Sequence, residues 1–274
     1  MSARSSGSSL SLFKLNRIWD VIVLAVAFFF VFLAFSVVQN MASTVLPSTV
    51  AFPMLGCLYL AFALINLFGA APLVDRIGTR PAMFFATITY TIFDASNVVA
   101  MLLADHLSAQ FAVLIPSSVL IGAGAAILWT AQGSYVVKCA SKYTIGRYTG
   151  VFFGIMSASN SVGPLFTSFL LENKFDKENA FKILSGVGAL GPLLILLYIW
   201  WLRPEPSNST FHSESSATEG QLATVDSTPL FLKVFKLVTC KKMWMVAPLF
   251  YLNSVEQTLG HFHYLSTLVM LELT

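Results

Sequence analysis

Long apolar runs follow one another along most of this chain, and they restrict its fold more than any other feature. A helix needs about 20 apolar residues to cross the roughly 30 Å hydrocarbon core of a bilayer. Runs near this length lie at 18–38, 54–74, 82–104, 109–137, 150–171, 181–202 and 243–259. Of the 274 residues, 56% are hydrophobic and 11% are charged, which is more apolar than a soluble domain. We therefore expect an all-α polytopic membrane protein with seven transmembrane helices, and the lipid bilayer as a partner.

The lysines and arginines are divided unevenly between the two sides that these spans define. Thirteen of the 16 precede the first span or follow the second, fourth and sixth spans. Because cytoplasmic loops carry an excess of Lys and Arg, the N-terminus is predicted to be cytoplasmic. Four of the five tryptophans lie at the same predicted ends, where an indole prefers the headgroup zone: Trp19, Trp200, Trp201 and Trp244. The choice between the plasma membrane and an endomembrane stays open.

Composition changes along the chain predict five segments. We expect a cytoplasmic tail over 1–17, a six-helix membrane block over 18–202, a disordered cytoplasmic linker over 203–229, an interfacial amphipathic helix over 230–242, and a further transmembrane helix within 243–274. The linker is rich in Ser, Thr, Pro and Glu and has no apolar period. In the amphipathic segment, Lys233 and Lys236 share one helix side and the apolar residues lie largely on the other, which is typical of a helix lying in the interface.

The sequence patterns typical of an enzyme, a cofactor site or a nucleic-acid partner are incomplete or absent in this sequence. Gly122-x-Gly124 begins like a dinucleotide loop, but Ile127 stands where the third glycine belongs and no strand precedes it. The cysteines are few and scattered, so we expect no disulfide framework and no metal site. We find no Ser/His/Asp constellation and no paired carboxylates. We therefore expect no enzymatic activity and no cofactor, and the basic residues at membrane faces do not indicate nucleic acid.

Small residues recur every four positions in the fourth and fifth spans. They are Ser118, Gly122, Ala126 and Thr130 in the fourth, and Gly150, Gly154 and Ala158 in the fifth. Small residues at this spacing let helix backbones approach closely in lipid, where no hydrophobic drive brings helices together. We therefore expect both sets to be helix-packing faces.

Asp94 lies near the middle of the third span, with Tyr90, Asn97 and Met101 on its flank at helical spacing. A carboxylate at the centre of a transmembrane helix costs about 2.5 to 3.5 kcal/mol on insertion scales. Such a cost argues for a partner, a proton or a cavity. Two interpretations stay open: a proton or cation site facing a central cavity, and a protonated or hydrogen-bonded structural aspartate.

Other polar or amphipathic residues also fall inside the spans. Trp129 and Gln132 share one helix flank with small neighbours, so we expect both to face protein or a cavity rather than lipid. Asn66, Gln132 and Asn160 are expected to form hydrogen bonds between helices. Glu256 is the other acidic residue well inside a span, and it is a candidate for a cavity or an interface.

The loop "APLVDRIGTR", residues 71–80, joins the second and third spans. It resembles the loop motif of the major facilitator superfamily at Leu73, Asp75, Arg76, Gly78 and Arg80, and it departs from that motif at Ala71, Val74 and Thr79. The resemblance implies that the acid and bases of the loop pair with neighbouring helix ends and hold one conformational state. The interpretation as an ordinary basic turn stays open beside it.

Three stretches resemble the uncoordinated-93 (Unc-93) family of ion-channel regulatory proteins, a branch of the same superfamily. They are "GAGAAILWTAQGSYV" at 122–136, "GRYTGVFFGIMSASNSVGPLF" at 146–166 and "APLFYLNSVEQTL" at 247–259. The resemblance implies two six-helix halves with any substrate cavity between them. This chain would supply the N-terminal six-helix half of a major facilitator fold plus a seventh transmembrane helix, and it therefore looks truncated.

Two functions remain open at this point. The resemblance implies an accessory membrane protein that regulates potassium channels or assists the trafficking of other membrane proteins. The alternative is a proton- or cation-coupled secondary transporter of a small solute, with Asp94, Gln132 and Glu256 in or near its pathway. Both predict the same fold, and the sequence names neither a substrate nor a partner.

Overall fold

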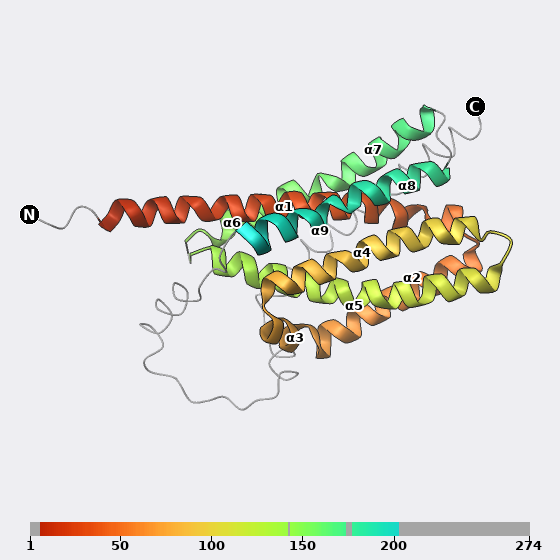
Figure 1. Ribbon diagram of the computed structural model, residues 1–274, viewed down its shortest axis with the longest axis horizontal. Helices are drawn as coiled ribbons and strands as arrows, with labels where there is room; N and C mark the ends of the chain where they lie inside the picture. Colours follow the sequence, from red (N-terminus) through yellow and green to blue (C-terminus); the bar gives the residue numbers. More distant parts are fainter. Residues whose placement is uncertain (1–5, 142, 174–176, 203–274) are drawn as a thin grey trace, which may run out of the picture. The chain divides into compact units, whose positions relative to one another are not determined.

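The computed structural model describes residues 6–141, 143–173 and 177–202, and every regular element within these ranges is a helix (Figure 1). In chain order they are α1 (Ser6–Val45), α2 (Ser48–Phe68), α3 (Ala70–Ile77), α4 (Thr79–Leu102), α5 (Leu107–Cys139), α6 (Ile145–Ser157), α7 (Ser159–Glu172), α8 (Lys177–Gly188), α9 (Leu190–Leu194) and the π-helix η1 (Ile195–Leu202). The predicted linker, interfacial helix and seventh span, with Glu256, lie outside the described residues.

Five stretches of the described part are long and apolar enough to cross a membrane. They are Arg17–Asn40, Ser48–Phe68, Thr79–Leu102, Leu107–Cys139 and Lys182–Trp200. Four of these correspond closely to predicted spans. The second and fifth predicted spans differ from what the structure shows, and in both cases a proline lies near the difference.

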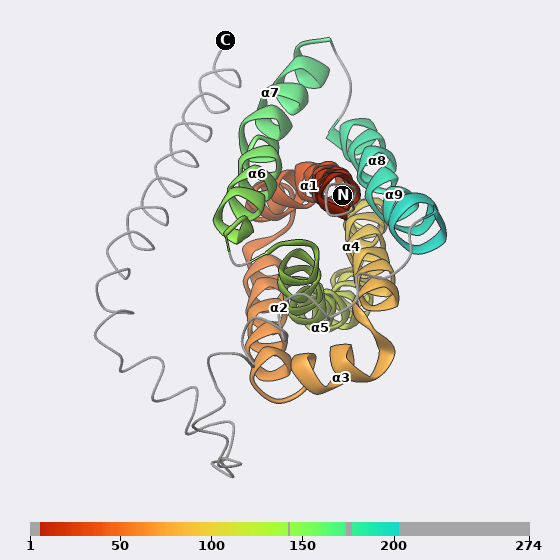
Figure 2. The same ribbon diagram turned by 90° about the vertical axis from the view of Figure 1, so that its left-hand side faces the viewer.

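The second span is displaced toward the N-terminus relative to its predicted range. α2 begins at Ser48 and ends at Phe68, and residues 70–74, predicted to continue it, belong to the separate helix α3. Pro72 has no backbone N–H to donate to the carbonyl of Phe68, so a continuous helix would lose a hydrogen bond at this point. The break at Gly69 lets α3 run across the end of the bundle (Figure 2).

The predicted fifth span is divided between α6 and α7, which meet at Ala158. The N–H of Ala158 donates to the carbonyl of Ile155 at 3.3 Å, a three-residue closure that tightens the end of a helix. Pro164 follows within α7 and cannot donate to the carbonyl of Asn160. Neither helix alone is long enough to span, and both pack along α1.

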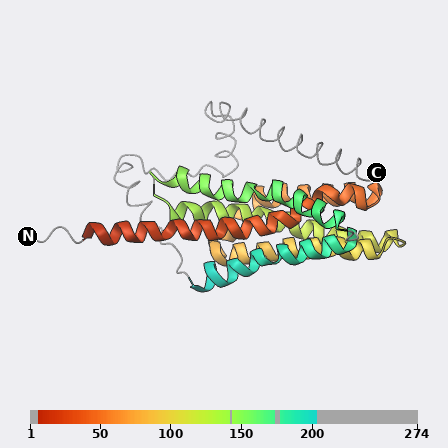
Figure 3. The same ribbon diagram turned by 90° about the horizontal axis from the view of Figure 1, so that it is seen from above.

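α1 lies between two groups of helices (Figure 2). It contacts α6 and α7 on one side and α8 and α9 on the other, while α5 packs against α2 and α4. The long helices run roughly alongside one another (Figure 3). Two glycines permit close approach of backbones: a Cβ at Gly122 would lie 2.3 Å from the carbonyl oxygen of Leu58, and one at Gly191 would lie 2.7 Å from that of Ala27.

Candidate functional site

The loop motif occupies α3 and the start of α4. Gly78 separates these two helices with φ of 86°, a conformation that residues with a Cβ rarely adopt. Leu73, Asp75 and Arg76 are exposed on α3, whereas Arg80 is half-buried at the start of α4. Arg80 is therefore the charged side chain of the motif that is partly buried in the bundle.

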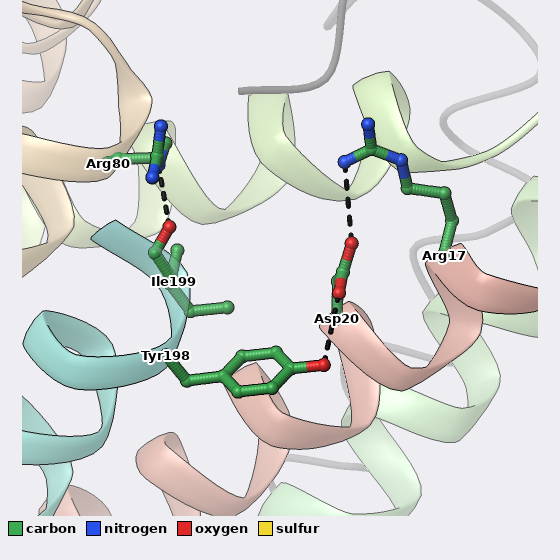
Figure 4. A network of polar contacts seen from close by, with 5 residues as sticks. All are labelled: Arg17, Asp20, Arg80, Tyr198 and Ile199. Atoms are coloured by element: carbon green, nitrogen blue, oxygen red, sulfur yellow. Dashed lines mark hydrogen bonds and ion pairs between the residues drawn. The ribbon is translucent and has the colours of Figure 1, made fainter. Parts of the chain in front are cut away.

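Arg80 binds the end of η1, far along the chain (Figure 4). Its Nε donates to the carbonyl of Ile199 at 2.6 Å, and its guanidinium also donates to the carbonyl of Trp200. The last carbonyls of a helix have no partner within the helix, and a cation there also favours the helix dipole. The Trp200 ring lies against Phe84 and Phe85, with centroid distances of 5.4 and 6.0 Å.

Asp20 attaches the same end of η1 to α1. Its carboxylate is buried, pairs with Arg17 at 3.3 Å, and accepts a hydrogen bond of 3.3 Å from the hydroxyl of Tyr198 (Figure 4). We call Arg17, Asp20, Arg80 and Tyr198, with the carbonyls that Arg80 binds, the basic-end clamp. The clamp joins α1, α4 and η1, so Arg17 and Arg80 lie at one end of the bundle, as the charge distribution predicts.

Asp20 and Tyr198 are not among the candidate residues that the sequence patterns predict. A local signal for Asp20 exists, because Arg17 and Asp20 stand three residues apart on a helix, where opposite charges meet. No signal in a single sequence connects Asp20 with Tyr198, which lies 178 positions further along.

Asp94 lies well inside α4 with 1% of its surface exposed. Its Oδ1 is buried without a hydrogen-bond partner among the described residues. The amide of Asn97 donates to the carbonyl of Phe93 at 2.9 Å rather than to this carboxyl group. Tyr90, one turn earlier, is also buried and interacts electrostatically with Asp94.

The surroundings of Asp94 come from three helices. A Cβ at Gly188 of α8 would lie 3.4 Å from Oδ2 of Asp94 and 2.7 Å from the Cβ of Ala34 on α1. The ring of Phe35, also on α1, lies 5.1 Å from that of Tyr90 and 6.0 Å from that of Phe93. The buried carboxyl group therefore lies beside the backbone of α8 at Gly188, on a helix whose neighbouring rings pack against Phe35 of α1.

Trp129 belongs to an aromatic cluster that joins α5, α1 and α6. Its ring lies 5.9 Å from Phe28, 5.4 Å from Phe32 and 6.2 Å from Phe153, with the last pair nearly parallel at 10°. Gln132, one turn later on α5, is buried with 5% exposed. Both side chains face protein, and their role in a cavity or in coupling stays a prediction.

The two sets of small residues have different surroundings. On α5, Gly122 meets the backbone of α2, and the hydroxyls of Ser118 and Thr130 donate to carbonyls of their own helix. On α6, Gly150 and Gly154 are exposed, and a Cβ at either would meet nothing within 4 Å. The second set therefore presents an open surface in the described part of the chain.

Two of the predicted interhelical amides also have different environments. Asn160 accepts a hydrogen bond of 3.3 Å from the hydroxyl of Ser36 on α1, whereas Asn66 is exposed near the end of α2. Cys57 and Cys139 are free, and no group of three or more His, Cys, Asp or Glu side chains that could hold a metal occurs among the described residues.

A helical bundle with five apolar spans and buried polar contacts between its helices defines an integral membrane protein with several transmembrane helices. Within that class, the family model "Ion channel regulatory protein UNC-93" matches residues 50–269. This match covers most of the chain, and the chain belongs to the UNC-93 family. The resemblance seen in the sequence motifs is thereby confirmed.

Curated relatives carry the family name across animals and plants. UNC93-like protein MFSD11 of Xenopus laevis is 26% identical over 262 residues, covering 89% of this chain and 56% of its own length. UNC93-like protein 3 of Arabidopsis thaliana is 28% identical over 165 residues, covering 56% of this chain and 33% of its own length. The chain spans about half the length of the first of these relatives.

A third relative has a name that states a function. The Caenorhabditis elegans protein unc-93, whose name describes it as a candidate potassium channel regulatory protein, is 26% identical over 166 residues, covering 57% of this chain and 22% of its own length. No solved structure matches the chain.

Proposed function

We propose that this chain is part of a membrane protein that regulates a potassium channel or the delivery of other membrane proteins. The observation that carries the proposal is the UNC-93 family match over residues 50–269. The name of the nematode relative specifies a potassium channel as the object of regulation. The expected partners are the bilayer and an ion channel or another membrane protein.

An open surface on α6 supports a role in contacts with another helix. Gly150 and Gly154 of α6 are exposed, as is Ala158 directly after it, and small residues let a second helix approach closely in lipid. The exposed rings of Phe153 and Phe169 lie on the same broken span, which α6 and α7 form. This surface is where we expect a partner helix to pack.

The finer architecture belongs to the same proposal. The chain contributes the N-terminal six-helix half of a major facilitator fold and a seventh helix, with the N-terminus in the cytoplasm. The contact of Arg80 with the end of η1 supports this architecture, because the resemblance of the loop motif implies pairing with a neighbouring helix end. The basic-end clamp then lies on the cytoplasmic side.

A second candidate function is a proton- or cation-coupled transporter of a small solute. The observation that favours it is Asp94, a carboxyl group buried inside a spanning helix whose Oδ1 has no partner among the described residues. Ionisable residues in such positions are rare and mark ion pathways or proton relays in membrane proteins.

One experiment with two variants separates the two functions. The native full-length protein is deleted from cells and replaced by a Gly154→Phe or an Asp94→Asn variant. The regulatory function predicts that Gly154→Phe lowers the amount of a potassium channel at the cell surface, because the added ring blocks the α6 surface. The transport function predicts that Asp94→Asn abolishes pH-dependent solute uptake while surface delivery is unchanged.

Gly56→Phe is the matched control for the first variant. Gly56 is an exposed glycine of α2 with nothing within 4 Å of a Cβ position, as at Gly154. An equal loss of surface channel in both glycine variants would contradict a specific α6 surface. A normal amount of channel at the cell surface in both variants would contradict the proposed contact at α6.

A further inference from the structure

We propose that Asp94 is a proton-binding site within the membrane, closed on one side by the backbone of α8 at Gly188. The ligand of the site is a single proton, which Asp94 holds as a neutral carboxylic acid and can release as a carboxylate. No comparison with known proteins assigns this site. This proposal goes beyond channel regulation. It identifies the proton as the ion for the second candidate function, coupled transport. Only the link to transport rests on that candidate function, and the proton site itself does not.

Asp94 forms no salt bridge with any of the described residues. Asp94 has 1% of its surface exposed, and its Oδ1 has no hydrogen-bond partner among the described residues. A buried carboxylate without a cation or donors is unfavourable, whereas its protonated form removes the charge and needs one acceptor. The geometry therefore favours a group that carries a proton.

A metal cation is the alternative ligand for this carboxyl group. Cations bound through oxygen generally take six or more oxygen ligands. The amide of Asn97, one turn further along α4, donates to the carbonyl of Phe93 and not to Asp94. The described part of the chain has no cluster of acidic or histidine side chains that could complete a shell. A proton needs no such shell.

The backbone of α8 approaches the Asp94 carboxyl group closely. A Cβ at Gly188 would lie 3.4 Å from Oδ2 of Asp94 and 2.7 Å from the Cβ of Ala34. The glycine therefore lets the α8 backbone close over the carboxyl group. α8 ends at Gly188 and α9 begins at Leu190, because Pro192 cannot donate to the carbonyl of Gly188. The site lies beside a break in a helix, where freed backbone groups can serve a buried polar side chain.

Other titratable and charged groups also lie on the helices that pack around Asp94. Tyr90 is the neighbour that interacts with it electrostatically, and Tyr59 of α2 interacts with Tyr90 in turn. The other charged side chains that the structure describes on α1, α4, α5 and α8 are Arg17, Asp20, Arg80, Lys138 and the exposed Lys182, and none of these forms a salt bridge with Asp94. We assign the pH response of this site to Asp94.

The test uses dicyclohexylcarbodiimide, an apolar reagent that modifies protonated carboxyl groups. The acid proton passes to a nitrogen of the reagent, the carboxylate oxygen adds to its central carbon, and the adduct rearranges to a stable N-acylurea. The full chain, in native membranes or in nanodiscs, is labelled over a range of pH, and the modified peptide is identified by mass spectrometry. We expect labelling at Asp94 that decreases as the pH rises.

Three variants define the site. Asp94→Asn is expected to abolish the labelling of this peptide, and Asp94→Glu to retain it. Gly188→Ala is expected to reduce it severalfold, because the added methyl group crowds Oδ2 and Ala34. Asp75→Asn is the matched control: Asp75 is exposed on α3, and its removal should leave labelling at Asp94 unchanged. The helical circular dichroism of each variant shows whether it is folded.

Each outcome decides the proposal. Labelling at Asp94 that falls with rising pH and is insensitive to salt supports a proton site. Protection by sodium or potassium at constant pH would overturn it in favour of a cation site. Absence of labelling at every pH in the folded wild-type chain would also overturn it. Proton-coupled uptake is measured separately in liposomes, so its absence would remove the transport function and leave the proton site standing.

Discussion

The guanidinium of Arg80, at the start of α4, donates a hydrogen bond of 2.6 Å to the carbonyl of Ile199 near the end of η1. This contact joins the loop motif to the last helix of the described bundle. Arg80→Ala should lower the free energy of unfolding by about 1.5 to 3 kcal/mol, the range for hydrogen bonds that involve a charged group. Arg80→Lys should lose part of this, because lysine lacks the planar fork. Thermal unfolding in detergent measures both effects.

Arg76→Ala serves as the control for the Arg80 variants. Arg76 belongs to the same motif and is exposed on α3, where charges contribute about 0 to 1 kcal/mol. Equal destabilisation by the two alanine variants would show that the contact with η1 does not stabilise the bundle.

Asp20 accepts contacts from Arg17 and Tyr198, and the two contacts should be coupled. Tyr198→Phe is expected to lower stability by about 1 kcal/mol and Asp20→Asn by about 1 to 3 kcal/mol. The double variant should be less destabilised than the two single effects added together, because both remove the same hydrogen bond. A double-mutant cycle measures the coupling, and strict additivity would contradict a direct contact.

Replacing a glycine of α5 by alanine should have opposite effects on stability at two positions, Gly122 and Gly133. A Cβ at Gly122 would lie 2.3 Å from the carbonyl oxygen of Leu58, whereas one at Gly133 would meet nothing within 4 Å. Gly122→Ala should destabilise by about 1 to 3 kcal/mol, since α2 must move away from α5. Gly133→Ala should be neutral or stabilise by up to about 1 kcal/mol, through helix propensity. Unfolding measured on both variants tests whether α2 packs here.

Membrane orientation can be tested with single cysteines after Cys57, Cys139 and Cys240 are replaced. Tyr143→Cys, at an 88% exposed position after α5, should react with a membrane-impermeant maleimide from the cytoplasmic side. His106→Cys, at an exposed position before α5, should react from the opposite side. The reverse pattern would show that the N-terminus is not cytoplasmic, because the positive-inside assignment would be inverted.

Sequence patterns predicted the spans well where a long apolar run is uninterrupted, as in α4 and α5. They placed the second span incorrectly, because hydropathy does not register the break that Gly69 and Pro72 introduce. The predicted fifth span is one apolar run in the sequence and two helices in the structure. Hydropathy averages over such local backbone effects.

The candidate site was predictable where a residue conflicts with its surroundings. Asp94 stands out because a carboxyl group in an apolar run is costly, and Arg80 because it belongs to a recognisable motif. Asp20 lies at the edge of the first run, where a charge is ordinary, and its partner Tyr198 comes from the opposite end of the bundle sequence. Long-range polar contacts of this kind depend on tertiary packing, which one sequence does not encode in any local pattern.

The potassium-channel form of the proposed function can be tested on the full-length protein in its native cells. The most direct measurement is the whole-cell potassium current in cells that express the protein naturally, compared with cells from which its gene is deleted. We expect a changed current after deletion, restored by the native full-length protein and not by its Gly154→Phe variant. An unchanged potassium current after deletion would contradict regulation of a potassium channel by this protein.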